Sequence, residues 1–213
     1  MSEQVLKKSG TVQKGRSKVR TIAQVAMLGA VATVLMLFEF PIPFLAPPFY
    51  ELDFSEVPVL IGAFAMGPIA GIAIEAVKIL LNFVLNGTIT AGVGEIANFL
   101  VGCAFLLPAA LVYRKKKTRN HAILGMIAGT VVMTTVACVL NAWILLPAYG
   151  IAFGMPVETF IEMGTAINGA IDSLFTFALL AVGPFNLLKV LLVSGIVLLL
   201  YKRIRVILRG DYS

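Results

Sequence analysis

The chain contains few of the side chains from which catalytic and metal-binding sites are usually built. Its 213 residues include one histidine, His121, which adjoins a basic segment, and two cysteines, Cys103 and Cys138, which lie in apolar runs without CxxC spacing. Histidine-based metal sites, serine–histidine catalysis and a structural disulfide are therefore not expected. No GxxxxGK[ST] motif occurs, which argues against ATP binding through a P-loop. We expect neither an enzyme nor a bound cofactor or metal.

Charged residues are also scarce. They make up 13% of the chain, whereas hydrophobic residues make up 59% and the mean hydropathy is +0.96. Apolar runs long enough to cross about 30 Å of hydrocarbon recur along the sequence. The polar, basic first 20 residues and the long run after them do not fit a cleavable signal peptide. The composition predicts a polytopic membrane protein.

The basic residues lie almost entirely in three segments. These are residues 7–20, 114–119 and 202–209, whereas the acidic residues lie mostly in the alternate connections between apolar runs. Because basic loops stay on the cytoplasmic side, both termini and the mid-chain basic segment should face inward. A nucleic-acid binder is not favoured, despite the net charge of +6.

The apolar runs and the basic segments together predict the number of transmembrane helices. Because the basic segments all lie on the cytoplasmic side, an even number of crossings must separate them. Clear spans are 21–38, 94–113, 122–146 and 184–201, and a break at Gly67-Pro68 divides the long run 57–85 in two. Segment 167–182 carries Asn168 and Asp172, and its crossing would put the basic tail outside. We therefore assign it to an external connection that could dip in and cover a cavity.

These considerations predict an all-α membrane protein with six transmembrane helices. Both termini are cytoplasmic, the second helix is short, and the first and fifth loops are long and external. A basic cytoplasmic tail would occupy residues 1–20, the transmembrane domain residues 21–204, and a second cytoplasmic tail residues 205–213.

The most distinctive segment is 39–58, with the sequence EFPIPFLAPPFYELDFSEVP. It holds five prolines, five aromatic residues and only acidic charges. Since proline lacks the N–H that a helix needs, this segment cannot be a spanning helix. A stiff, aromatic, anionic loop beside apolar helices favours a lid over a small-molecule pocket.

Polar residues inside apolar helices are costly and need partners or a purpose. The spacing of Glu75, Lys78 and Asn82 places them on one helix face, which is typical of an internal ion pair; proton coupling and ligand contact are alternatives. On the first helix, Ala23, Ala26, Ala30 and Thr33 form a stripe of small residues, which suits either internal packing or docking of another membrane subunit.

Three further polar groups are predicted near the external end, as is the aromatic loop. They are Glu95 with Asn98, Asn141 near Trp143, and Asn186 with Lys189. Structural roles are the alternatives, since an acid complements a helix N-terminus, tryptophan anchors at interfaces and lysine snorkels. Their predicted convergence with the loop indicates a ligand site.

The segment from Phe38 onward, FEFPIPFLAPPFYELDFSEVPVLIGAFAMGPIAGIAIEAVKILLNF, followed by GEIANFLVG, resembles the riboflavin-binding S component of bacterial energy-coupling factor (ECF) vitamin transporters. The resemblance runs over residues 20–205 and is strongest over 38–101. There, the Pro/Phe loop, the L-D-x-S-E-V-P turn, the G-P break and the G-E-I-x-N-F motif stand in order.

The resemblance implies a substrate-capture subunit in the bacterial cytoplasmic membrane, with riboflavin as the transported substrate. A transmembrane coupling subunit and two cytoplasmic ATPases would supply the energy, and Ala26 and Ala30 match the family's A-x-x-x-A docking motif. The pocket would be formed by the first loop, helices four to six and the fifth loop. Residues implied to cover the flavin ring are Phe44, Leu45, Phe49 and Tyr50. Residues implied to bind its polar edge and ribityl hydroxyls are Glu95, Asn98, Asn141, Asn186 and Lys189.

Riboflavin also suits these residue types, because aromatic side chains suit a flat tricycle and amides suit an imide edge and hydroxyls. The lack of arginine near the external side favours neutral riboflavin over flavin mononucleotide, although a helix N-terminus also binds phosphate. Alternatives are a capture subunit for thiamine or a pyridoxine-like vitamin, a proton-coupled permease using Glu75, Lys78 and Glu95, and a membrane scaffold without a small ligand.

Overall fold

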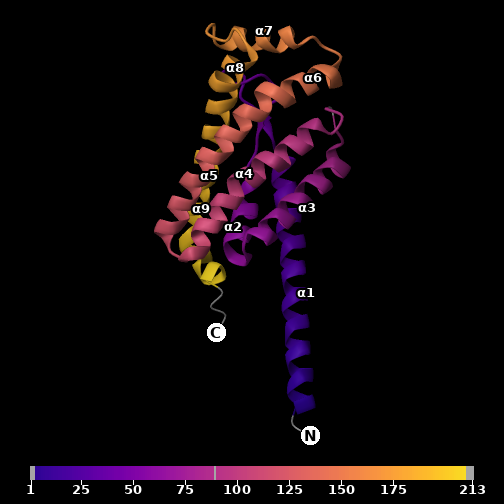
Figure 1. The fold of residues 1–213 in the computed structure, drawn as a ribbon, viewed down its shortest axis with the longest axis vertical. Coiled ribbons are helices and arrows are strands. Elements are labelled where there is room, and N and C mark those ends of the chain that lie inside the picture. Colours follow the sequence, from indigo (N-terminus) through magenta and orange to yellow (C-terminus); the bar gives the residue numbers. More distant parts are fainter. Residues whose placement is uncertain (1–2, 89, 210–213) are drawn as a thin grey trace.

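The computed structural model of the chain describes residues 3–88 and 90–209 and is almost entirely helical (Figure 1). Its elements, in order, are α1 (Glu3–Met36), β1 (Phe40–Pro41), β2 (Glu51–Leu52), α2 (Glu56–Met66), α3 (Pro68–Asn86), α4 (Val93–Lys115), α5 (Arg119–Leu140), the π-helical segment η1 (Asn141–Leu145), α6 (Leu146–Phe153), α7 (Val157–Ile167), α8 (Leu174–Phe177), the π-helical segment η2 (Ala178–Val182) and α9 (Gly183–Arg209).

Five helical stretches of the described chain are long and apolar enough to cross a membrane. They are Lys18–Met36, Pro68–Asn86, Val93–Lys115, Arg119–Phe153 and Leu174–Tyr201, and α2 is a shorter apolar helix between the first two. This confirms the predicted all-helical, multi-pass class. In Figure 1 the α4–α5 turn and the C-terminal end of α9 lie at one end of the bundle, toward which the N-terminal part of α1 extends, and α6 and α7 lie at the other.

The break predicted at Gly67-Pro68 separates α2 from α3. Gly67 ends α2 with φ +101°, a conformation that residues with a Cβ rarely adopt, and its N–H still bonds to the carbonyl of Ala63 at 2.9 Å. Pro68 then opens α3 at a position where a helix has no use for the missing N–H. Two helices of 11 and 19 residues therefore replace one long span.

The last membrane-length stretch begins at Leu174, whereas the predicted start is residue 184. The additional residues form α8 and η2, which precede α9. Residues 174–182, which were predicted to belong to the fifth loop, are therefore the first part of this helix, and their external position stays a prediction. Ser173 and Thr176 form a capping box, and Thr176 Oγ1 also donates to Asp172 at 3.0 Å. The two polar residues that argued against a crossing, Asn168 and Asp172, precede this cap, so neither lies within the membrane-length helix.

The fourth membrane-length stretch, Arg119–Phe153, also continues further than predicted, from α5 through η1 into α6. Pro147 lies near the start of α6, directly after the π-helical turn. A π-helical turn shifts the hydrogen-bond pattern by one residue, which lets a helix accommodate a proline that has no N–H to give. The continuous stretch ends at Gly154, which adopts φ +63°.

The main core lies between α2, α4, α5 and α9. Phe64, Phe105, Tyr113 and Val197 are almost completely buried in it. Helices α4 and α5 approach closely where the backbone of α4 faces Gly129, at which a Cβ would lie 2.5 Å from the carbonyl oxygen of Phe105. This packing fixes the frame on which the first loop and the cavity beneath it rest.

Candidate functional site

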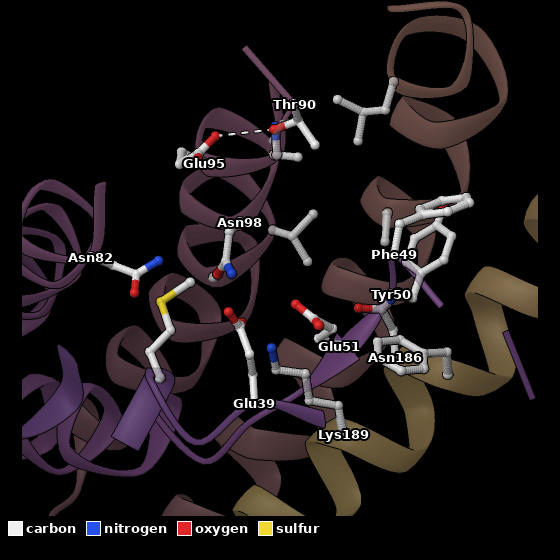
Figure 2. Close-up of a pocket in the computed structure, with 18 of the residues that line it drawn as sticks. Glu39, Phe49, Tyr50, Glu51, Asn82, Thr90, Glu95, Asn98, Asn186 and Lys189 are labelled. Atoms are coloured by element: carbon white, nitrogen blue, oxygen red, sulfur yellow. Dashed lines mark hydrogen bonds between the residues drawn. The ribbon is translucent and has the colours of Figure 1, made fainter. Parts of the chain in front are cut away.

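A cavity of about 350 Å³ lies under the connection between α1 and α2. Side chains reach it from that loop, from α3 and α4, from the α5–η1–α6 helix and from α9 (Figure 2). This volume is within the range of small-molecule sites, about 300–1,000 Å³. It is larger than a second cavity, of about 300 Å³, at the turn between α2 and α3.

The α1–α2 loop is held over the cavity by a short strand pair and by one ion pair. Strands β1 and β2 pair antiparallel, with Phe40 opposite Leu52. Beyond β2, Asp53 Oδ2 accepts a hydrogen bond from Lys189 Nζ of α9 at 2.7 Å, and Asp53 Oδ1 accepts one from the N–H of Ser55 at 2.7 Å. The loop is therefore tied to the last helix of the bundle.

Aromatic side chains form one wall of the cavity. The ring centroids of Phe49 and Tyr50 lie 4.7 Å apart; Phe49 lies 5.8 Å from Tyr149, and Tyr50 lies 5.8 Å from Phe185. All four line the cavity, and the Tyr50 hydroxyl donates to Asn141 Oδ1. The arrangement offers a flat ligand ring both aromatic faces and edges.

The predicted amide and acid groups line the same space. Asn141 Nδ2 donates to the carbonyl of Ala137 at 2.8 Å, and Asn186 Nδ2 donates to that of Val182 at 2.9 Å, which fixes both side chains. Glu95 accepts from Thr88 Oγ1 at 3.1 Å and Thr90 Oγ1 at 3.2 Å. Figure 2 shows Asn98 between Glu95 and Lys189, pointing into the cavity.

The loop side of the cavity is strongly acidic. Burial, and then repulsion from Glu51 and Asp53, raises the pKa of Glu39 to about 7, and burial raises the pKa of Glu51. Burial would also raise the pKa of Asp53, but the ammonium groups of Lys189 and Lys78 lower it to about 2. Lys189 is the one cationic residue among those that line the cavity.

The remaining predicted loop residues, Phe44 and Leu45, do not line the cavity in this structure. Phe44 is 80% exposed, and Leu45 packs against the buried cluster of Ala46, Leu52 and Phe185. Their predicted cover of a ligand ring therefore stays a prediction.

Beside the cavity lies a buried charge cluster. Lys78 Nζ lies 2.8 Å from Glu56 Oε1 and 2.7 Å from Glu75 Oε1, and none of these side chains is more than 3% exposed. The predicted internal ion pair is thus present, with Glu56 as an additional partner. Asn82, the third residue of that pattern, instead lines the cavity.

On α1, the small-residue stripe divides between two faces. Ala26 and Ala30 are exposed, whereas the Thr33 hydroxyl is buried and donates to the carbonyl of Gly29 at 2.9 Å. Gly29 faces α3, where a Cβ would lie 2.5 Å from Val77. Internal packing therefore accounts for Gly29 and Thr33, and it leaves the Ala26/Ala30 face without a partner in the described part of the chain.

Sequence patterns do not identify several residues that line the cavity: Thr88, Thr90, Tyr149 and Phe185. Thr88 and Thr90 were recognisable in principle, because two threonines next to a glycine-rich helix start are typical caps. Tyr149 and Phe185 lie in apolar runs, where nothing in the sequence separates a cavity-lining ring from a packed one.

Comparison with known proteins gives consistent matches over almost the whole chain. The family model for the substrate-specific component of ECF transporters matches residues 20–201. The riboflavin transporter RibU of Staphylococcus aureus (strain TCH60) is 38% identical over 185 residues, which cover 87% of this chain and 90% of that protein. The riboflavin transporter FmnP of Bacillus subtilis (strain 168) is 33% identical over 189 residues, covering 88% and 93%. A solved structure of the S component of a bacterial ECF transporter has a TM-score of 0.69 at 38% identity, covering 88% of this chain and 96% of that one.

Proposed function

The chain belongs to the family of substrate-specific components of ECF transporters, and we propose that it captures riboflavin in the cavity under the α1–α2 loop. Relatives in two bacteria that are named riboflavin transporters support this assignment over most of their length. The chain is a transport subunit and not an enzyme.

The lining of the cavity is the observation that supports riboflavin as the ligand. One wall is aromatic, and the other lining residues are mostly polar and include no arginine. The isoalloxazine ring would lie against Phe49, Tyr50 and Tyr149. Amides such as Asn98, Asn141 and Asn186 would bind the pyrimidine edge and the ribityl hydroxyls. Lys189 has three donors, of which Asp53 takes one, so two remain for carbonyl or hydroxyl oxygens.

The cavity suits riboflavin better than its phosphate. Its lining includes the carboxylates Glu51, Glu56 and Glu95, as well as the partly buried Glu39, and it lacks the arginine that usually binds phosphate in a bidentate manner. A dianionic phosphate among these acids would be repelled. Flavin mononucleotide should therefore bind at least about tenfold more weakly, which corresponds to ~1.4 kcal/mol.

In the membrane, we place six crossings, with both termini in the cytoplasm. The short α2 would be the second crossing, shielded by its neighbours, and the α1–α2 loop and residues 154–173 would be the long external loops. The basic α4–α5 turn and C-terminal end lie together at one end of the bundle, which supports this orientation (Figure 1). The organism would be a bacterium and the membrane its cytoplasmic membrane.

Capture would be followed by delivery to the cytoplasm together with an energy-coupling module. That module would consist of a transmembrane coupling subunit and two ATPases, and the exposed Ala26/Ala30 face of α1 would dock on the transmembrane subunit. The ATPases are required because riboflavin must be released against the affinity of this cavity.

The experiment is a visible absorption spectrum of the purified chain, followed by titration with riboflavin, flavin mononucleotide and thiamine. We expect a flavin band and saturable fluorescence quenching by riboflavin, a weaker response to flavin mononucleotide, and none to thiamine. Binding of thiamine in place of riboflavin would leave the family intact and overturn the substrate.

A further inference from the structure

A second cavity, of about 300 Å³, lies at the other end of α3 and α4 from the first one. It occupies the corner where α2 turns into α3 beside the C-terminal end of α4. Its walls are mostly apolar and include Phe64, Met66, Ile69 and Ala110, and the cations Arg114 and Lys117 stand at its edge.

These two cations have no acidic partner in the described part of the chain. The ion pairs found there are those of Lys78 with Glu56 and Glu75 and of Lys189 with Asp53. Both side chains are exposed; Arg114 lies in the last turn of α4 and Lys117 follows it, and cations at this end complement the helix dipole. The interaction with the helix dipole explains why cations occur at this end of α4, but it does not explain the apolar cavity beside them.

The apolar walls continue to the outer surface of the bundle. Ile69, at the first turn of α3, is 82% exposed, whereas Phe64 and Ala110 are 2% and 1% exposed. A ligand in this corner would therefore touch buried apolar walls at one end, an apolar outer surface along its length and two cations at its head. A soluble anion would contact the two cations but would gain nothing from the buried apolar walls or from the apolar outer surface.

We propose that this corner binds one anionic phospholipid, with its phosphate at Arg114 and Lys117 and an acyl chain along Phe64, Met66 and Ile69. Basic pockets between helices on the cytoplasmic side suit anionic headgroups, and each nearby cation contributes to their attraction. A zwitterionic lipid would bring its own cation next to these two. The site is remote from the riboflavin cavity, so it does not depend on the proposed substrate.

The test is native mass spectrometry of the full chain, released from micelles that contain equal amounts of phosphatidylglycerol and phosphatidylcholine with the same acyl chains. We expect the chain to retain phosphatidylglycerol in preference to phosphatidylcholine. The Arg114→Gln/Lys117→Gln variant should retain phosphatidylglycerol about tenfold less, because it lacks both headgroup contacts.

Two further variants separate the pocket from general surface charge. Lys115→Gln/Lys116→Gln removes the same charge from exposed neighbours outside the cavity, and it should retain the lipid to within about twofold. Ala65→Phe keeps every charge but fills the cavity, and it should lose the lipid. Size-exclusion profiles and helix content would show that each variant is folded.

The proposal fails if both charge variants lose the lipid equally, if Ala65→Phe retains it, or if phosphatidylcholine is held as well as phosphatidylglycerol. Displacement of the lipid by inorganic phosphate would also overturn it, since that result would indicate a site for a soluble anion.

Discussion

Lys189 is the residue on which the α1–α2 loop and the cavity both depend. Its ammonium pairs with Asp53 at 2.7 Å, and both side chains are at most 9% exposed. Removing one partner of a buried ion pair leaves the other charge uncompensated, whereas removing both often costs little. The pair thus closes the loop over the cavity while leaving two ammonium protons for a ligand.

The Lys189→Met variant should therefore lose about 3–5 kcal/mol of stability, because it leaves Asp53 charged and buried. The double variant Asp53→Asn/Lys189→Met should recover most of that loss. Thermal unfolding of the two single variants and the double variant would measure this coupling. If the stability loss of the double variant equals the sum of the losses of the two single variants, the two side chains are not coupled and the prediction is contradicted.

Gly102 allows the charge cluster around Lys78 to form against α4. A Cβ at this position would lie 2.6 Å from Glu75 Oε1 and 3.0 Å from Glu56 Oε1. Gly102→Ala should therefore destabilise the protein by about 1–3 kcal/mol, the usual cost of overpacking. A matched control is Gly195→Ala in α9, where no atom lies within 4 Å of the new Cβ. Equal melting temperatures for the two variants would show that the cluster tolerates the added group.

Glu39 should make stability depend on pH near neutrality. Its pKa in the fold, about 7, exceeds the ordinary value of 4.5, so the folded state holds a proton that the unfolded chain has already released. Stability is then lost as pH rises between these two values and levels off above the higher one. Melting curves from about pH 5 to about pH 8 should show wild type losing stability relative to Glu39→Gln. If the stability of wild type relative to Glu39→Gln stays constant or increases as pH rises, the raised pKa of Glu39 is contradicted.

At the scale of elements, the sequence was informative wherever proline, glycine or charge interrupted an apolar run. The prolines of segment 39–58 predicted the loop, and Gly67-Pro68 predicted the break between α2 and α3. The sequence does not indicate the start of the last helix, because Asn168 and Asp172 lie in the same apolar segment as residues 174–182. In the structure they precede the capping box of Ser173, a tertiary detail of two side chains.

The cavity residues divide in the same way. Charged and amide side chains stand out in apolar runs, so Glu95, Asn98, Asn141, Asn186 and Lys189 could be predicted, and all five line the cavity. Tyr149 and Phe185 could not, since a ring in an apolar helix carries no mark of the direction in which it points. Phe44 could be singled out by type, yet it is exposed in this structure.

Helix α1 presents the exposed face that we propose as the docking surface for the transmembrane coupling subunit. Ala26 and Ala30 are exposed, whereas Gly29 of the same helix faces Val77 of α3. Ala26→Leu/Ala30→Leu should block ATP-driven riboflavin uptake at least about tenfold and leave riboflavin binding unchanged, because bulk there prevents close helix approach. Val31→Leu, on an exposed position of another face, is the control. Loss of binding together with uptake would mean that the alanines serve the fold of the chain itself.

At the scale of the whole molecule, the two ends of the bundle differ in the residues they carry. The end with α6 and α7 carries the α1–α2 loop and the cavity proposed for riboflavin, and the end with the α4–α5 turn carries the basic segments (Figure 1). A chain with this division and without a P-loop motif should bind its substrate alone but concentrate it only with ATPase partners.

The most direct measurement is riboflavin titration of the purified chain by flavin fluorescence, with Asn141→Leu and Trp143→Phe in parallel. Asn141 is 4% exposed and lines the cavity, whereas Trp143, two residues away, is 70% exposed and outside it. We predict saturable quenching at about one riboflavin per chain, at least roughly tenfold weaker binding for Asn141→Leu, and no change for Trp143→Phe. No quenching by riboflavin, or equal affinity for all three proteins, would contradict capture of riboflavin in this cavity.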